Sequence, residues 1–244
     1  VFDVCHTCRV CYTLCPSFVK FFEVTDDIAG IFGNIEELST EQIHLVTDLC
    51  NQCKICDPIC PYTPPHYLDL DFPRTLVRYN FLRKKREGLT LRDRMFGHVD
   101  FVGTLSSWFA PLVNWANNHP LIRKQMEDLI GIHKDRHLPK FHFKTFWDWA
   151  KRRAFPKGRT QEKVLLYYTC TVNYNEPDIG KAAVAVLEKQ GVEVYVPKQE
   201  CCGLPFVDSG MPEHFLKKVE KNVKLLVDAV RQGYKIVAPS ASCS

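Results

Sequence analysis

Two short runs of cysteine constrain this chain more than any other feature. Residues 5–16 read CHTCRVCYTLCP and residues 50–61 read CNQCKICDPICP, so both follow the spacing C-x2-C-x2-C-x3-C-P. Three thiolates spaced in this way lie on one tight turn, where they can hold three irons of a [4Fe–4S] cube. Two copies of the run, each ending in a proline that fixes the outgoing backbone, predict two such clusters.

The last cysteine of each run cannot reach the cube that the other three hold, so it ligates the other cluster, as in two-cluster ferredoxins. The resulting metal ligands are Cys5, Cys8, Cys11 and Cys60 for one [4Fe–4S] cluster, and Cys50, Cys53, Cys56 and Cys15 for the second. Zinc sites more often use separated C-x2-C pairs, and disulfide scaffolds are short secreted chains. Neither alternative suits two tetrads of cysteine in a chain of 244 residues.

Composition narrows the class of protein. Hydrophobic residues make up 45% of the chain, which favours a globular protein over a disordered one. We find neither an export signal nor an uninterrupted apolar stretch long enough to span a bilayer, so abundant thiols indicate a reducing cytoplasm. The net charge of +4 is too mild to argue for a nucleic-acid partner. The chain starts without Met and stops one residue after Cys243, so we expect a piece of a longer protein.

The pattern along the chain predicts three parts. Residues 1–71 form a two-[4Fe–4S] ferredoxin-like domain, in which Ser39 and Gln42 predict a capped helix toward Asp48. Residues 72–160 form a helical connecting segment that begins with a basic helix over 72–87, ending at Gly88. Residues 161–244 form an α/β domain. The predicted fold class is therefore mixed α+β and α/β, with a helical two-cluster domain followed by a parallel-sheet domain.

The connecting segment carries many aromatic side chains among Arg, Lys and His: Trp108, Phe109, Trp115, Phe141, Phe143, Phe146, Trp147, Trp149 and Phe155. Apolar residues between Val99 and Val113 recur at roughly helical spacing, with a break near Pro111. Such helices mostly pack against a core. Trp and Phe beside cationic residues are also typical of segments that lie in the headgroup plane of a membrane. Residues 99–155 are therefore either a packed linker or a peripheral membrane-surface element.

The last part of the chain alternates between the hydrophobic patterns of strands and of helices. We expect strands at residues 164–168, 192–196 and 236–238, separated by helices at 177–190 and 212–232. The first of these helices has proline at its start and glycine after its end, as helices commonly do. Strand–helix–strand alternation predicts a parallel sheet.

The remaining cysteines all follow predicted strands. Cys170 follows the first strand, Cys201 and Cys202 the second, and Cys243 the third. Ligands of open parallel sheets bind beyond the carboxyl ends of the strands. The pattern therefore predicts that these four thiols converge in a third metal or redox site, with Gly203 allowing a sharp turn. The alternative is a set of buried free cysteines or a vicinal disulfide.

These residues carry a resemblance to known proteins. The Cys201-Cys202-Gly203 sequence, with Cys170 before it and Cys243 after it, resembles the cysteine-rich CCG domain of heterodisulfide reductase. Ferredoxin-type runs ahead of such a domain are similar to the iron–sulfur subunits of glycolate oxidase, lactate-utilisation enzymes and anaerobic glycerol-3-phosphate dehydrogenase. Segments 97–103, 109–114, 138–141 and 172–175 resemble the iron–sulfur subunit of the last of these.

The resemblance implies an electron-transfer subunit of an oxidoreductase complex, with no substrate-binding catalytic residues of its own. A flavoprotein dehydrogenase subunit would supply electrons, and this chain would pass them toward membrane quinone at the inner face of the cytoplasmic membrane. The cofactors implied are the two [4Fe–4S] clusters and a third iron–sulfur cluster at the CCG cysteines, with no flavin on this chain. His98 lies in a matching segment, but a lone histidine is more often structural than a quinone contact.

Other functions stay open at this point. In heterodisulfide reductase the CCG domain ends C-x-x-C and five cysteines hold a noncubane cluster, whereas only Ser244 follows Cys243 here. The chief alternative is a heterodisulfide-reductase-like protein that cleaves a disulfide at a CCG-bound cluster, and a further one is a redox sensor or scaffold. Quinone reduction and thiol release from a disulfide distinguish the first two.

Overall fold

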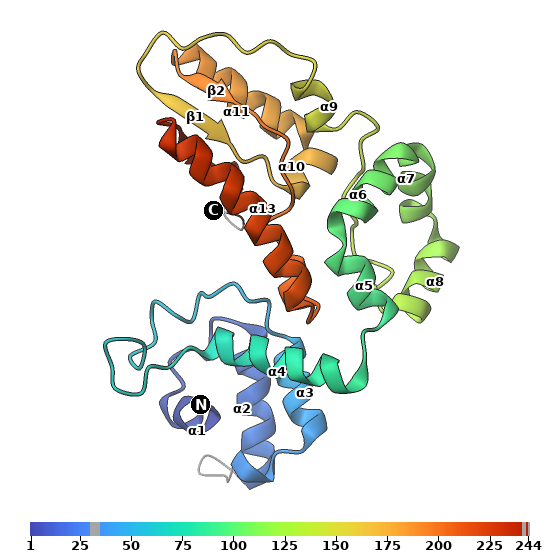
Figure 1. The fold of residues 1–244 in the computed structure, drawn as a ribbon. Coiled ribbons are helices and arrows are strands. Elements are labelled where there is room, and N and C mark those ends of the chain that lie inside the picture. Colours follow the sequence, from blue (N-terminus) through green and yellow to red (C-terminus); the bar gives the residue numbers. More distant parts are fainter. Residues whose placement is uncertain (30–34, 241–242, 244) are drawn as a thin grey trace. The chain divides into compact units, whose positions relative to one another are not determined.

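The computed structural model describes residues 1–29, 35–240 and 243 and divides into two compact units, residues 1–88 and 89–244 (Figure 1). In the first unit the helices are α1 (Phe2–Cys8), α2 (Pro16–Ala29), the short 3₁₀ helix η2 (Ile35–Glu37), α3 (Thr40–Asp48) and α4 (Phe72–Glu87). The capping box predicted for α3 is confirmed, because Ser39 accepts from the backbone of Gln42 and the Gln42 side chain accepts from the backbone of Ser39. The predicted end of α4 at Gly88 is also confirmed.

Aromatic side chains of α2 form the core of the first unit. Phe21 and Phe22 of α2 are almost completely buried, and Phe18 stacks on Phe72 of α4 with ring centroids 4.5 Å apart. Leu76 of α4 belongs to the same cluster, so the start of this basic helix packs with the cysteine-rich part. Several cysteines pack against this core: Cys5, Cys11, Cys15, Cys50 and Cys56.

The second unit begins with short helices. These are α5 (Leu91–Gly97), α6 (Val99–Trp108), α7 (Ala110–Asn118), α8 (Pro120–Ile130) and α9 (Phe146–Ala150). The break predicted near Pro111 lies at Phe109, because Pro111 occupies the first turn of α7, where its missing N–H is not needed.

A small parallel sheet follows, with strands β1 (Lys163–Leu166), β2 (Glu193–Tyr195) and β3 (Lys235–Val237) in the order β2-β1-β3. Its helices are α10 (Cys170–Tyr174), α11 (Pro177–Lys189), α12 (Leu204–Asp208) and α13 (Pro212–Arg231). The predicted fold class is confirmed: a helical part precedes a parallel α/β part. The predicted strands and helices lie within one or two residues of those observed, since prolines and glycines mark their ends.

Neighbouring residues of β1 point to opposite faces of the sheet, as the pleat requires. Leu166 packs with Val184 of α11 and with Phe146 of α9. Leu165 packs with Ala229 of α13. Helices α11 and α13 therefore cover opposite faces (Figure 1).

The aromatic residues of the connecting segment divide into two groups. Phe146 is completely buried, and Trp147, Trp149 and Phe155 pack against the sheet core beside it, as the packed-linker interpretation expected. The earlier group is exposed. The exposed fractions are 68% for Phe101, 67% for Trp108, 53% for Phe109, 62% for Leu112 and 56% for Trp115.

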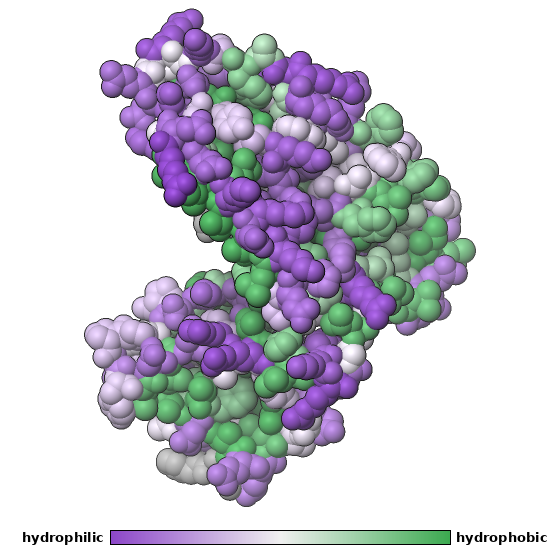
Figure 2. Space-filling view, in the orientation of Figure 1, coloured by the Kyte–Doolittle hydropathy of each residue, from purple (hydrophilic) through white to green (hydrophobic). Residues whose placement is uncertain are grey.

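We call the exposed apolar side chains of α6 and α7 the α6–α7 apolar surface, formed by Phe101, Leu105, Trp108, Phe109, Leu112 and Trp115. Figure 2 shows the apolar colouring over this helical region. Among the helices of the described residues, none has both the length and the apolarity needed to cross a membrane.

The segments that carry the resemblance contact one another in the second unit. The side-chain amide of Asn114 donates to the Phe141 carbonyl over 2.8 Å and accepts from the Phe141 N–H over 2.9 Å. The Tyr174 hydroxyl donates to the Asp100 carbonyl over 3.2 Å. A Cβ at Gly103 would lie 2.5 Å from the Tyr174 ring, so only glycine lets α6 approach α10 this closely. Segments far apart in sequence thus hold α6 against the start of the CCG part.

Candidate functional site

The first group of thiols lies in a small cavity of the first unit. The cysteines that line it come from both runs and are Cys5, Cys8, Cys11 and Cys60. Its apolar wall includes Phe18 and Phe22 of α2. Burial raises the pKa of Cys5 and Cys11 most, and Cys60 is close enough to both for its charge to raise it further. The structure therefore brings the last cysteine of the second run to the first three cysteines of the first run.

A second group of thiols surrounds Cys56. Burial raises the pKa of Cys56 most, and the charges of Cys11 and Cys15 of the first run and of Cys50 raise it further. The side-chain amide of Gln52 donates to the sulfur of Cys50 over 3.4 Å. Cys53 is the exposed cysteine of this run. Cys15, Cys50 and Cys56 thus lie near one another, with Cys53 at the surface.

The protonation of these thiols tests whether iron–sulfur clusters fit the two groups. Burial, followed by the charges of nearby thiols, raises the pKa of Cys5 to about 12 and that of Cys56 to about 12. Burial likewise raises the pKa of Cys11 to about 11. Thiols held close together in apolar surroundings stay protonated unless a cation offsets their charge, and a bound metal deprotonates them. The donor set fits clusters, which would supply that positive charge.

A single metal ion makes a different geometric demand, because its ligands converge on one point. Within residues 1–29, 35–240 and 243, no three His, Cys, Asp or Glu side chains are arranged to hold one ion. A four-iron cube instead places irons and sulfides between its thiolates.

The third group of thiols lies beyond the sheet, where all four predicted cysteines meet. The buried Cys201 thiol forms hydrogen bonds with Cys170, at the start of α10, and with Cys202. Cys202 in turn forms a hydrogen bond with Cys243, which follows β3. The bond from Cys201 lowers the pKa of Cys202, since it stabilises the thiolate. Gly203 has a φ of 91°, which turns the chain directly after the cysteine pair.

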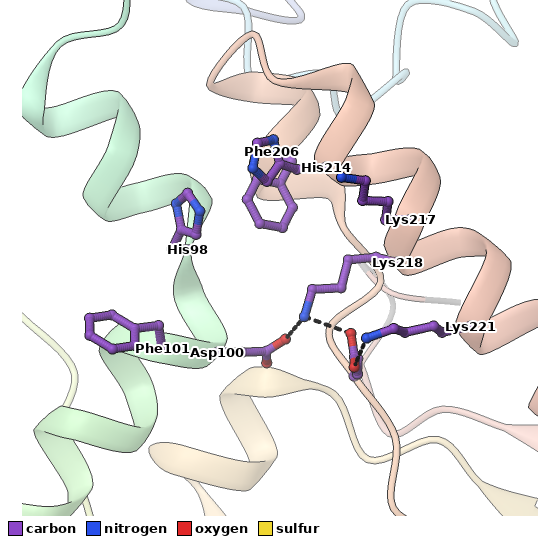
Figure 3. A pocket seen from close by; sticks show the side chains of 9 residues that line it. His98, Asp100, Phe101, Phe206, His214, Lys217, Lys218 and Lys221 are labelled. Atoms are coloured by element: carbon purple, nitrogen blue, oxygen red, sulfur yellow. Dashed lines mark hydrogen bonds and ion pairs between the residues drawn. The ribbon is translucent and has the colours of Figure 1, made fainter.

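Charged side chains hold the Cys201 backbone in place. One Asp100 carboxylate oxygen accepts from the Cys201 N–H over 3.2 Å and from the Lys218 ammonium over 2.7 Å. Lys218 also pairs with Glu200 over 2.8 Å, so the ammonium lies between two carboxylates (Figure 3). The buried side chain of Asn222 donates to the Cys201 carbonyl over 3.0 Å. The sequence pattern did not predict this network, because no local signal pairs Asp100 with a residue so far along the chain.

A cavity of about 340 Å³ opens beside this network and is shown in Figure 3. The His98 ring packs edge-on against Phe206 with centroids 5.0 Å apart, and against His214 with centroids 5.4 Å apart. Lys218 and Lys221, which line the cavity, are already paired with Asp100 and Glu200. His98 therefore has structural contacts, and the acidic partners offset much of the positive charge of this cavity.

Comparisons with known proteins match both cysteine-containing parts of the chain to family models. Residues 1–86 match the model described as the citrate utilization protein B Fer4-like domain, and residues 164–244 match the CCG family, a cysteine-rich domain. The C subunit of anaerobic glycerol-3-phosphate dehydrogenase from Escherichia coli is 32% identical over 157 residues, which are 64% of this chain and 40% of that protein. The chain resembles that protein.

Lactate utilization protein A is a second kind of relative. The Bacillus pumilus protein is 42% identical over 82 residues, 33% of each chain, and the Bacillus subtilis protein is 36% identical over 83 residues, 34% of this chain and 33% of its own. No solved structure matches the chain. The two domain matches and the relatives support an iron–sulfur role associated with an oxidoreductase. The match spans only 40% of the length of the glycerol-3-phosphate dehydrogenase relative.

Proposed function

We propose that this chain is an iron–sulfur electron-transfer subunit that accepts electrons from a flavoprotein dehydrogenase and passes them toward membrane quinone. The observation that carries the proposal is the gathering of cysteine thiols into crossed groups in the first unit and into one group beyond the sheet in the second. When bound, two [4Fe–4S] clusters and a third cluster at the CCG cysteines would supply one-electron transfer. The similarity to the Escherichia coli relative favours a glycerol-3-phosphate dehydrogenase-like partner.

The protein supplies the surroundings of these groups. Phe18 and Phe22 give the first group of thiols an apolar wall, and Asp100 and Asn222 bond the backbone N–H and carbonyl of Cys201. Hydrogen bonds and burial around cysteine sulfur tune the potential of a bound cluster. The stoichiometry is balanced, because oxidation of an alcohol substrate by the flavoprotein releases two electrons and two protons, and reduction of a quinone to a quinol takes up the same numbers.

The test uses the intact protein, purified anaerobically with its flavoprotein partner. We expect glycerol-3-phosphate to drive quinone reduction in added membranes, which is measured as a fall in quinone absorbance. We expect no quinone reduction when this chain is omitted. A parallel assay follows thiol release from added disulfide. Thiol release without quinone reduction would favour the heterodisulfide-reductase-like alternative, and clusters that no flavoprotein partner reduces would favour a sensor or scaffold.

We further propose that the α6–α7 apolar surface brings the protein to the membrane peripherally. Its exposed Trp and Phe side chains are of the kind that enter the headgroup region. Lys124, Lys140 and Lys144 of the same unit are exposed and can meet anionic lipid.

Flotation with anionic liposomes tests this surface. A triple alanine variant of Phe109, Leu112 and Trp115 should lose most of its liposome binding, because each exposed apolar side chain contributes buried area at the interface. The matched control replaces Leu216, Val223 and Val230, exposed apolar residues of α13, with alanine and should float like the unaltered protein. Equal flotation of all three proteins would remove the membrane-surface proposal.

A further inference from the structure

The second unit contains another cavity, of about 380 Å³, that the function proposed above does not use. We call it the aromatic cavity, and residues of α6, α9 and α10 line it together with the segments that follow β1 and β2. Trp147 and Tyr168 are among its lining residues, and their rings stack on each other with centroids 6.2 Å apart and an interplanar angle of 17°. Its size and aromatic walls suit a small planar molecule.

Two buried polar atoms in its lining have no hydrogen-bond partner. Ser107 is only 1% exposed, and its hydroxyl makes no hydrogen bond. The amide of Gln199 donates to the Leu166 carbonyl over 3.0 Å, which leaves its buried Oε1 unpaired. Leaving buried polar atoms unpaired is unfavourable. Both atoms are closed to solvent, so a ligand with matching groups pairs with them once the Ser107 and Gln199 side chains turn toward the cavity. A hydroxyl can donate to a ligand carbonyl, and an amide oxygen can accept from a ligand hydroxyl.

The opening of the cavity carries exposed aromatic side chains beside two exposed lysines, Lys151 and Lys198. Trp108 is 67% exposed and Phe143 is 65% exposed, and both line the opening. Trp108 also belongs to the α6–α7 apolar surface. A planar ligand with an apolar tail could therefore place its ring in the cavity and its tail along that surface.

Two residues that line the cavity are close in sequence to CCG cysteines. Tyr168 precedes Cys170 by two residues, and Gln199 precedes Cys201 by two residues. Consecutive Cα atoms are about 3.8 Å apart, so each pair of Cα atoms lies within about 8 Å. Two residues that line the aromatic cavity are therefore close along the backbone to cysteines of the third group.

We propose that the aromatic cavity binds the head group of a quinone. The ring stacks on the aromatic wall, a quinone carbonyl accepts from the Ser107 hydroxyl, and a hydroxyl of the reduced form donates to Gln199 Oε1. This inference rests on the proposed function, because it places the quinone-binding site of the same electron-transfer path.

Calorimetric titration of the intact protein with duroquinone tests the site. This probe has a fully methylated ring, so it cannot add to the cysteine thiols. Loss of one hydrogen bond should make binding to Ser107→Ala about five to ten times weaker. Ser106→Ala is the matched control, because Ser106 is the neighbouring half-buried residue of α6 and does not line the cavity. Thermal unfolding checks that both variants fold.

A second variant keeps the test decisive if Ser107→Ala is unstable. Phe143 is exposed at the rim, so Phe143→Ala should fold, and it should bind duroquinone several times more weakly. Unchanged affinity in both Ser107→Ala and Phe143→Ala, or no duroquinone binding by an intact complex that still reduces quinone, would overturn the cavity assignment and leave the proposed function standing. Site-dependent duroquinone binding in a complex that reduces no quinone would support the cavity and overturn the proposed function.

Discussion

Replacing Cys60 by serine is expected to remove the cluster held by Cys5, Cys8 and Cys11, although Cys60 belongs to the other cysteine run. The reason is the crossed arrangement, in which Cys60 lines the same cavity as those three cysteines. A serine hydroxyl is a much poorer ligand for iron than a thiolate. Iron bound by the first unit should fall from about eight to about four atoms per chain, the difference of one cube.

The measurement is iron content together with the electron paramagnetic resonance spectrum of the reduced protein. Cys53→Ser is the matched control, because Cys53 is the exposed cysteine of the same run and is assigned to the other cluster. The two variants should therefore lose different spectral components. If Cys60→Ser and Cys53→Ser lose the same component, the crossed assignment is wrong. Zinc near two atoms per chain with no iron would instead rule out the [4Fe–4S] clusters.

The crossed arrangement also bears on stability. Cys5 and Cys11 lie in the first run, and Cys60 follows α2 and α3 in the chain, so a shared cluster would close a loop around the helical core. Closing a long loop removes freedom from the unfolded chain. The phenylalanine core of α2 packs against the same cysteines, so cluster binding and core packing would stabilise each other.

Local signals made much of the fold predictable. Pro177 and Pro212 begin their helices, and Ser39 caps α3, so the boundaries of these elements followed from residues within a few positions of them. The gathering of the CCG cysteines was also predictable, because parallel strands bring their carboxyl ends to one edge of a sheet. Cys170, for example, needs only to follow β1 to lie at that edge.

Contacts between distant segments were not predictable in this way. The Asp100 carboxylate accepts from the Cys201 N–H, and Gly103 makes room for the Tyr174 ring, yet neither contact has a local pattern. The aromatic residues show the same limit. Phe146 and Trp108 are both aromatic residues of the connecting segment, but Phe146 is buried against the sheet and Trp108 is 67% exposed. Periodicity alone could not separate these roles, because tertiary packing decides which aromatic side chains face the core.

Replacing the CCG thiols is also expected to have a large effect on the iron content of the protein. The double variant Cys201→Ser, Cys202→Ser should lower the iron content of the intact protein from about twelve to about eight atoms per chain, the loss of one four-iron cluster. The spectra of the two clusters in the first unit should persist, because their ligands all come from residues 5–60. The expectation follows from the hydrogen-bonded contact of Cys201 and Cys202 with Cys170 and Cys243, a set of thiols of the kind that binds iron.

Cys170→Ser provides an independent check, because it alters the same group of thiols from a different element, α10. It should cause the same loss of iron as the double variant if all these thiols hold one cluster. Thermal unfolding must accompany the iron measurement, since Cys201 is only 3% exposed and its replacement places a hydroxyl in a buried site. A folded double variant with unchanged iron would show that these cysteines are structural, and the path from the first unit toward quinone would then lack its third cluster.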